Sequence, residues 1–415
     1  MSNSNSSAKK LIFLCWLAYS CSYIGKLSYS ANILPISEAF GVSNAECGIV
    51  ASVFFFVYGA GQIFNGIFCK KYNIKYVIFS ALTIASIMNL LVAIVPSFSL
   101  IKYIWLVNGA AMSFLWTSLI RLISETVPSS QMPTATVTMG TTVATGTFIV
   151  YAMSAIYTAT VDYRATFITA SALMMAVAVF WLTSYNGIVT PLLIERSMEI
   201  SDPAVSKKSG FTVSGYLPVF LGVVFVFCIS NNFIKDGLTS WTPKILSNLY
   251  STPDWLSILL TLLLAGLAIF GAFFAVRIQR ATKNFALSCA ILFSVGLALI
   301  IAVILLMGTS LIPVTIACFA ITSCLMAGVN NIVTSMIPLA LKDRMNSGRI
   351  AGIINGFCYL GSTASTYGLG LIADNYTWLS VFYVLAGACA LAASAGFIYA
   401  LISKVIKQKA NGKIS

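Results

Sequence analysis

Residues 11–35 read LIFLCWLAYSCSYIGKLSYSANILP, and this stretch decides the fold. It is longer than the roughly 20 apolar residues that a helix needs to cross a bilayer, yet it carries one ammonium group, that of Lys26. A charge inside a spanning helix is unfavourable unless it faces a cavity or a partner. Four polar side chains recur there at helical spacing and therefore share one face: Tyr19, Tyr23, Lys26 and Ser30. Such a face is typical of a helix that lines a water-filled pathway.

The composition of the whole chain indicates a polytopic membrane protein. Of its 415 residues, 59% are hydrophobic and only 8% are charged, and the mean hydropathy is +0.93. Soluble proteins contain about a quarter charged residues. The net charge of +13 comes from basic residues between apolar runs, so we expect no binding of nucleic acid. The 10 cysteines are scattered and the chain has no histidine, so we expect no metal site and no cofactor.

Apolar runs predict about twelve spanning helices in two pseudo-symmetric halves of about six each. The runs cover residues 11–34, 48–68, 76–95, 101–121, 136–158, 166–187, 217–238, 256–276, 285–307, 312–336, 349–372 and 378–402. The predicted organisation is a disordered cytoplasmic tail (1–10), an N-terminal half (11–187), a cytoplasmic central loop (188–216), a C-terminal half (217–403) and a cytoplasmic tail (404–415).

The basic residues are distributed asymmetrically between the two sides of the predicted bundle. All but five of the 24 fall in the tails and in the loops on the same side as the tails. The five exceptions lie in spans or in the opposite loops: Lys26, Lys102, Arg164, Lys235 and Lys244. Because basic loops stay on the cytoplasmic side, we expect a plasma-membrane protein with both termini in the cytoplasm.

The two halves also resemble each other. Lys26 lies in the first run and Lys235 in the seventh, and residues 162–164 and 374–376 introduce the sixth and twelfth runs with related sequences. Such a duplication, with a repeat axis along the membrane normal, places the substrate between the halves near the midplane. Access then alternates as one half rocks against the other.

Several short segments resemble one transporter family. They are Tyr19-x3-Tyr23-x2-Lys26 leading to Pro35, Tyr58-Gly59-Ala60-Gly61-Gln62, and residues 234–243 ending in Trp241-Thr242-Pro243. Trp116-x4-Arg121 and Tyr359-Leu360-Gly361 add weaker agreement. On these residues the chain resembles the major facilitator superfamily, and within it the organophosphate:phosphate antiporters and sugar-phosphate permeases. The resemblance implies an all-α integral membrane fold and a transporter that is not an enzyme.

The sequence departs from that subfamily in its charged residues. Lys26 and Lys235 stand where the family has phosphate-binding arginines. Gln62 replaces a lysine of the second span, and Thr142 lies near the position of a histidine. Lysine carries a point charge and lacks the two-pronged geometry with which arginine binds a phosphate.

The resemblance and the polar faces together predict a secondary transporter of a small organic anion. The expected substrate is a phosphorylated metabolite of the sugar phosphate or glycerol phosphate type, exchanged for inorganic phosphate by alternating access. The protein is expected to work in the lipid bilayer as a monomer. The predicted substrate-binding residues are Lys26, Lys235, Tyr19, Tyr23, Tyr58, Gln62, Asn355 and Tyr359. The candidates for gating or coupling are Asp236, Arg121 and Trp116.

Lys26 and Lys235 are expected to approach one anion from opposite halves. The alternative is that each ammonium group extends to the outer lipid headgroups. Asp236 is the one acidic residue within a predicted span. Because residues at i and i+1 do not share a helical face, we expect Asp236 to contact another helix, or to cap the outer end of its own, rather than to pair with Lys235.

Two other functions remain open from the sequence. One is a proton-coupled organic carboxylate symporter of the same superfamily, and the other is a non-transporting membrane sensor for a phosphorylated ligand. A membrane enzyme is not expected, because the chain has no histidine and no pair of carboxylates within its spans to act as acid and base.

Overall fold

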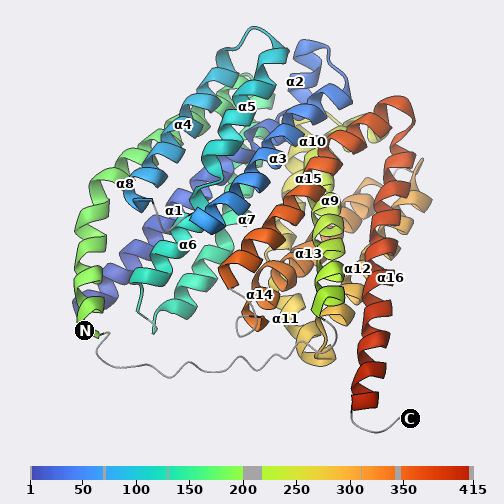
Figure 1. Ribbon diagram of the computed structural model, residues 1–415. Coiled ribbons are helices and arrows are strands. Elements are labelled where there is room, and N and C mark those ends of the chain that lie inside the picture. The colour runs from blue at the N-terminus through green and yellow to red at the C-terminus, as the bar shows by residue number, and fades with distance from the viewer. Residues whose placement is uncertain are drawn as a thin grey trace.

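The helices of the structure follow the apolar runs of the sequence. The computed structural model describes residues 2–68, 72–128, 130–199, 217–309, 311–341 and 347–410, and all regular structure within them is helical. Figure 1 shows the N-terminal half, coloured blue to green, beside the C-terminal half, coloured yellow to red. The start of α1 and the end of α16 lie at the same end of the bundle, and we name the opposite end the distal end.

The N-terminal half begins with α1 and ends with α8. Its helices are α1 (Ser2–Ala31), α2 (Ile33–Phe40), α3 (Asn44–Phe68), α4 (Ile74–Ile94), α5 (Phe98–Met112), α6 (Leu115–Thr126), α7 (Met132–Thr160) and α8 (Arg164–Glu199). The C-terminal half contains α9 (Leu217–Tyr250), α10 (Asp254–Ala268), α11 (Gly271–Thr282), α12 (Phe285–Leu306), α13 (Ile312–Asn331), a π-helical turn (Ile332–Met336), α14 (Ile337–Ala340), α15 (Ser347–Asn375) and α16 (Trp378–Ala410).

The number of spans agrees with the prediction. Among the described residues, 11 helical segments, counted across short breaks, are long and apolar enough to cross a membrane. The helix α15, with 29 residues, lies at the predicted run 349–372. It is less hydrophobic than the 11 segments counted above, because glycine, serine, threonine and tyrosine occupy much of its length. Of these residues, glycine, serine and threonine are small and allow close helix packing in membranes.

The ends of three segments differ from the prediction. The tail predicted as disordered is helical from Ser2 onward, since α1 begins there. The helix α8 continues to Glu199, so only residues 200–216 of the predicted central loop lie outside the described residues. The helix α16 extends to Ala410. Extending an existing helix adds one hydrogen bond for each residue that is ordered, so the spans continue into polar sequence.

Two predicted spans are broken in their middle. The run 101–121 is divided into α5 and α6 at Ser113, and the run 256–276 is divided into α10 and α11 at Ile269. At the first break, the Gln62 side chain donates a hydrogen bond to the carbonyl oxygen of Ser113 at 3.0 Å. This bond satisfies a buried backbone acceptor and ties α3 to the α5–α6 break.

The halves meet along a few helix pairs. The helix α3 packs on α15, α7 packs on α10, and α1 and α2 contact α9. The α3–α15 contact is close enough that a Cβ on Gly59 would overlap the side chain of Tyr359, and one on Gly356 would overlap Ile63. This packing brings α1, α3, α9 and α15 together in the centre of the bundle, where the polar faces predicted from the sequence converge.

Candidate functional site

Lys26 of α1 lies between the two halves. The residue is 6% exposed. Its ammonium group donates a hydrogen bond to the hydroxyl oxygen of Tyr359 on α15 at 3.1 Å. The two residues are 333 positions apart, so the bond joins the N-terminal half to the C-terminal half. Lys26 therefore does not extend to the headgroups in this structure.

Aromatic rings surround the same ammonium group. The distances from Lys26 Nζ to the ring centroids are 4.2 Å for Tyr58, 4.7 Å for Tyr23 and Tyr359, 5.5 Å for Phe55 and 5.9 Å for Phe54. A cation within about 6 Å of a ring centroid is attracted by the ring quadrupole, by up to about 2 kcal/mol when it is desolvated. The rings thus offset part of the unfavourable free energy of burying this charge. We name Lys26 and these five rings the aromatic cage.

The cage rests on the helical face that the sequence predicted. Tyr19 lies one turn before Tyr23, and their ring centroids are 5.3 Å apart. The ring of Trp116 on α6 packs against the ring of Tyr19, with 4.7 Å between the ring centroids. Trp116 therefore supports the wall of the cage, without contacting Lys26 directly.

Within the described residues, Lys26 forms no ion pair with a carboxylate. In the described ranges, the ion pairs join Arg121 to Glu125, Arg164 to Asp162 and Lys235 to Asp236. None of these pairs includes Lys26. An ammonium group that is buried in the middle of a membrane bundle without a paired carboxylate is the feature expected of an anion-binding site.

Lys235 is paired differently from the prediction. Its Nζ lies 3.3 Å from Oδ1 of Asp236, although the sequence argument made a pair between these neighbours unexpected. The prediction was wrong because it considered only the directions of the Cβ atoms. The four-carbon stem of lysine is long enough to turn back toward an adjacent carboxylate.

Asp236 is also held by two neutral donors that the sequence analysis did not select. Ser362 of α15 donates a hydrogen bond to Oδ2 of Asp236 at 2.5 Å, and the side-chain amide of Asn232 donates to the same oxygen at 3.2 Å. The bond from Ser362 provides the contact with another helix that was expected for Asp236. Ser362 lies three residues after Tyr359, on the same helical face, and this spacing is the signal that could have identified it.

The remaining predicted residues lie in different environments. Gln62 is one turn from Tyr58, but its amide donates to Ser113 within the N-terminal half. Asn355 is half-buried on α15, one turn before Tyr359. Arg121 binds Glu125 at 2.8 Å and the carbonyl oxygen of Tyr72 at 3.4 Å. The structure therefore does not bring Arg121 into the cage.

Direct hydrogen bonds join the halves on the distal side of the cage. The hydroxyl of Ser52 on α3 donates to the carbonyl oxygen of Thr363 on α15 at 2.7 Å. Tyr151 of α7 donates to the carbonyl oxygen of Thr239 on α9 at 2.8 Å. These bonds tie α3 to α15 and α7 to α9 distal to Lys26.

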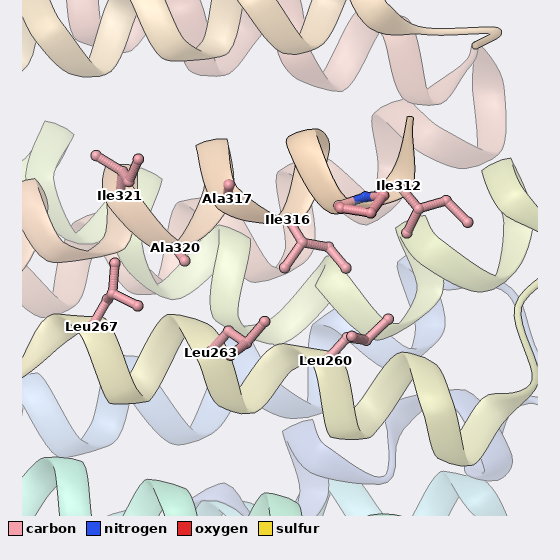
Figure 2. A pocket seen from close by; sticks show the side chains of 9 residues that line it. Leu260, Leu263, Leu267, Ile312, Ile316, Ala317, Ala320 and Ile321 are labelled. Atoms are coloured by element: carbon pink, nitrogen blue, oxygen red, sulfur yellow. The ribbon is translucent and has the colours of Figure 1, made fainter. Parts of the chain in front are cut away.

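A separate pocket lies within the C-terminal half. It has a volume of about 540 Å³ and lies between α10 and α13. Figure 2 shows leucines of α10 facing isoleucines and alanines of α13, and no charged side chain lines the pocket. The lining residues are Leu260, Leu263, Leu267, Ile312, Pro313, Ile316, Ala317, Ala320 and Ile321. An apolar lining of this kind does not suit an anion, in contrast to the surroundings of Lys26 in the aromatic cage.

Two curated proteins are similar to short parts of the chain. The membrane sensor protein UhpC of Escherichia coli (strain K12) is 24% identical over 101 residues, which cover 24% of this chain and 23% of UhpC. A probable hexose phosphate transport protein of Chlamydia trachomatis serovar D is 22% identical over 125 residues, which cover 30% of this chain and 27% of that protein. The matched parts thus span about a quarter of each relative.

Solved structures are similar over almost the whole chain. A bacterial homolog of the human lysosomal transporter Spinster, in its inward-facing and occupied conformation, has a TM-score of 0.74 at 13% identity and covers 94% of this chain and 96% of its own. The same homolog in its inward-facing and unoccupied conformation has a TM-score of 0.68 at 13% identity, and the match covers 96% of this chain and 95% of the homolog. At this identity the likeness shows the fold alone.

A family profile matches most of the chain. The profile of the Major Facilitator Superfamily matches residues 15–366, which include the cage, the Lys235–Asp236 pair and most of both halves. The protein is a transporter of the Major Facilitator Superfamily.

Proposed function

We propose that this transporter moves a small organic anion by alternating access, in exchange for a second anion. The observation that carries the proposal is the buried ammonium group of Lys26, which lies between the halves with aromatic rings and a phenol around it and, within the described residues, forms no ion pair. An anion that enters between the halves neutralises this charge. The proposed binding residues are Lys26, Tyr23, Tyr58 and Tyr359, with Lys235 and Asp236 nearby.

Exchange follows from the same charge. Closing an empty site removes the unpaired ammonium group from water, which is unfavourable. A bound anion offsets this free energy, so the loaded protein changes its orientation more easily than the empty one. A carrier of this kind exchanges one anion for another. It does not return empty.

The curated relatives support phosphorylated metabolites as the first substrates to test. One is a probable hexose phosphate transport protein, and the other is a membrane sensor. Exchange for inorganic phosphate is the finer form of the proposal. A thermal-shift screen of the purified protein with sugar phosphates, glycerol phosphate, carboxylates and inorganic phosphate selects the substrate for transport assays.

The test uses proteoliposomes and radiolabelled substrate. We expect uptake when the vesicles are preloaded with phosphate or unlabelled substrate, and little uptake into empty vesicles, even across a pH gradient. The variants Lys26→Ala and Lys235→Ala should abolish binding and exchange. As a control, Lys102→Ala removes a lysine from the α5 side of the bundle and should exchange like the wild type. Wild-type exchange by Lys26→Ala would refute the proposal.

The same assay separates the two other functions. A proton-coupled symporter would accumulate substrate in empty vesicles when a proton gradient is applied, and Asp236→Asn would abolish this uptake. A sensor would bind the ligand in the thermal-shift assay and show no exchange. Either result would refute anion exchange and support the corresponding alternative function.

A further inference from the structure

The central site contains three charged groups, and two of them neutralise each other. Within the part of the chain that the structure describes, these groups are Lys26, Lys235 and Asp236. Tyr359, which accepts a hydrogen bond from Lys26, and Ser362, which donates one to Asp236, lie three residues apart on one face of α15, so Lys26 lies near the Lys235–Asp236 pair. Lys235 and Asp236 form an ion pair at 3.3 Å. The site therefore offers an incoming anion one net positive charge rather than two.

Asp236 is fixed as an acceptor. Its Oδ2 receives hydrogen bonds from Ser362 and from Asn232, and its Oδ1 faces the ammonium group of Lys235. A carboxylate accepts hydrogen bonds at both oxygens, whereas a protonated acid would direct its own O–H against these donors. The arrangement thus holds the negative charge in place on the C-terminal side of the site. Its side chain is 17% exposed, so bulk water screens the charge only in part.

We propose, on the basis of the proposed function, that the transporter binds its substrate as a monoanion. Suitable ligands are organic carboxylates, phosphodiesters and phosphate monoesters that carry one proton. A dianion would leave one uncompensated negative charge when the halves close around it, next to the carboxylate of Asp236. An uncompensated charge in a desolvated site is strongly unfavourable. Asp236 acts in this proposal as a specificity-determining residue.

The aromatic cage favours an apolar group next to the charge. Five rings lie within 5.9 Å of Lys26 Nζ, and Tyr19 and Trp116 extend this wall away from the cation. An anion with an aromatic ring therefore places its charge against Lys26 and its ring against the wall. For this reason we choose phenyl-substituted probes.

The test compares matched probes at one pH. Phenyl phosphate is a dianion at about pH 8, since the second phosphate pKa is near 6, and its methyl ester, methyl phenyl phosphate, is a monoanion of similar shape. Phthalate and monomethyl phthalate form a second pair. Binding is measured by isothermal titration calorimetry on the full-length protein in detergent. We expect the wild type to prefer the monoanion of each pair by about tenfold, because one unit charge at 4–6 Å changes such equilibria by at least this factor.

Variants assign this preference to Asp236. Asp236→Asn retains the shape and the hydrogen-bond acceptor but gives the site two positive charges, so it should reverse the preference toward the dianions. Asp236→Glu keeps the charge and should restore the preference for monoanions. Asp162→Asn removes a carboxylate that is 45% exposed between α7 and α8, and it should behave like the wild type.

The outcomes distinguish this inference from the proposed function. Tighter binding of the dianions by the wild type, or an unchanged preference in Asp236→Asn, would refute the monoanion inference and leave anion transport intact. If Lys26→Ala binds the probes as well as the wild type does, or if no anion binds to the wild type, the proposed function fails and the inference fails with it.

Discussion

The carboxylate of Asp374 accepts a hydrogen bond from the backbone N–H of Asn44, although the two residues are 330 positions apart. The N–H of Ala45 donates to the second oxygen of the same carboxylate at 2.6 Å, and the side-chain amide of Asn44 donates to the first at 2.7 Å. Asp374 lies near the end of α15, and Asn44 begins α3. A carboxylate of the C-terminal half thus caps the N-terminus of a helix in the N-terminal half, where the helix dipole is positive.

A lysine completes this contact. Lys244 of α9, which is 8% exposed, donates a hydrogen bond to the side-chain oxygen of Asn44 at 2.5 Å. The helices α3, α9 and α15 are thereby joined at the distal end. In the alternating-access cycle that we propose, the distal end opens, and these bonds would then break once in each cycle.

The first prediction concerns this distal contact. Asp374→Asn removes the negative charge and one acceptor from the α3 N-terminus, and it should destabilise the closed distal end by about 1 kcal/mol. Hydrogen–deuterium exchange of the amides of Asn44 and Ala45 should become about fivefold faster. Asp162→Asn, which removes a carboxylate that is bonded to Arg164 of its own segment, should leave these amides unchanged. Equal exchange in the two variants would show that Asp374 does not hold the contact.

The second prediction concerns the phenol of Tyr359. Tyr359→Phe keeps the ring of the cage but removes the acceptor that positions Lys26. Since a hydrogen bond to a charged group contributes about 1.5–3 kcal/mol, we expect the Kd of the transported anion to rise by about tenfold. Tyr367→Phe changes a residue of the same helix that is 38% exposed, and it serves as the control. Unchanged affinity in Tyr359→Phe would mean that the rings alone position the cation.

The third prediction concerns the packing of α15 on α9. A Cβ on Gly361 would overlap the backbone carbonyl of Ile229, whereas a Cβ on Gly368 would meet open space. Gly361→Ala should therefore destabilise the fold by about 1–3 kcal/mol. Gly368→Ala should be neutral or slightly stabilising, since alanine favours helices over glycine by about 1 kcal/mol. Thermal unfolding in detergent measures both, and equal melting temperatures would contradict this packing.

The fourth prediction concerns orientation in the membrane. In a cysteine-free background, Ser99→Cys, at an exposed position at the distal start of α5, should react with a membrane-impermeant maleimide added to intact cells. Ser206→Cys, in the segment predicted to be cytoplasmic, should react only after the cells are permeabilised. The opposite labelling pattern would place the termini outside the cell.

Local patterns in the sequence were enough to predict the helices and the helical face that carries Lys26. Length and hydropathy predicted about twelve spans, and the described residues contain 11 that meet these criteria, together with α15. The spacing of Tyr19, Tyr23 and Lys26 predicted one polar face, because the helical repeat fixes such neighbours locally. Tyr359 was selected from its own helix in the same way.

Which of these residues meet depends on contacts between distant segments, and the sequence does not reveal them. The bond between Lys26 and Tyr359 spans 333 residues, and the contact between Asp374 and Asn44 spans 330. Gln62 was assigned to the substrate, but its amide satisfies the backbone at a helix break that hydropathy does not reveal. The Lys235–Asp236 pair depends on the conformation of a long side chain and on the donor from Ser362. Periodicity along one helix determines the face of each residue, whereas the partner across the interface depends on how the two halves pack.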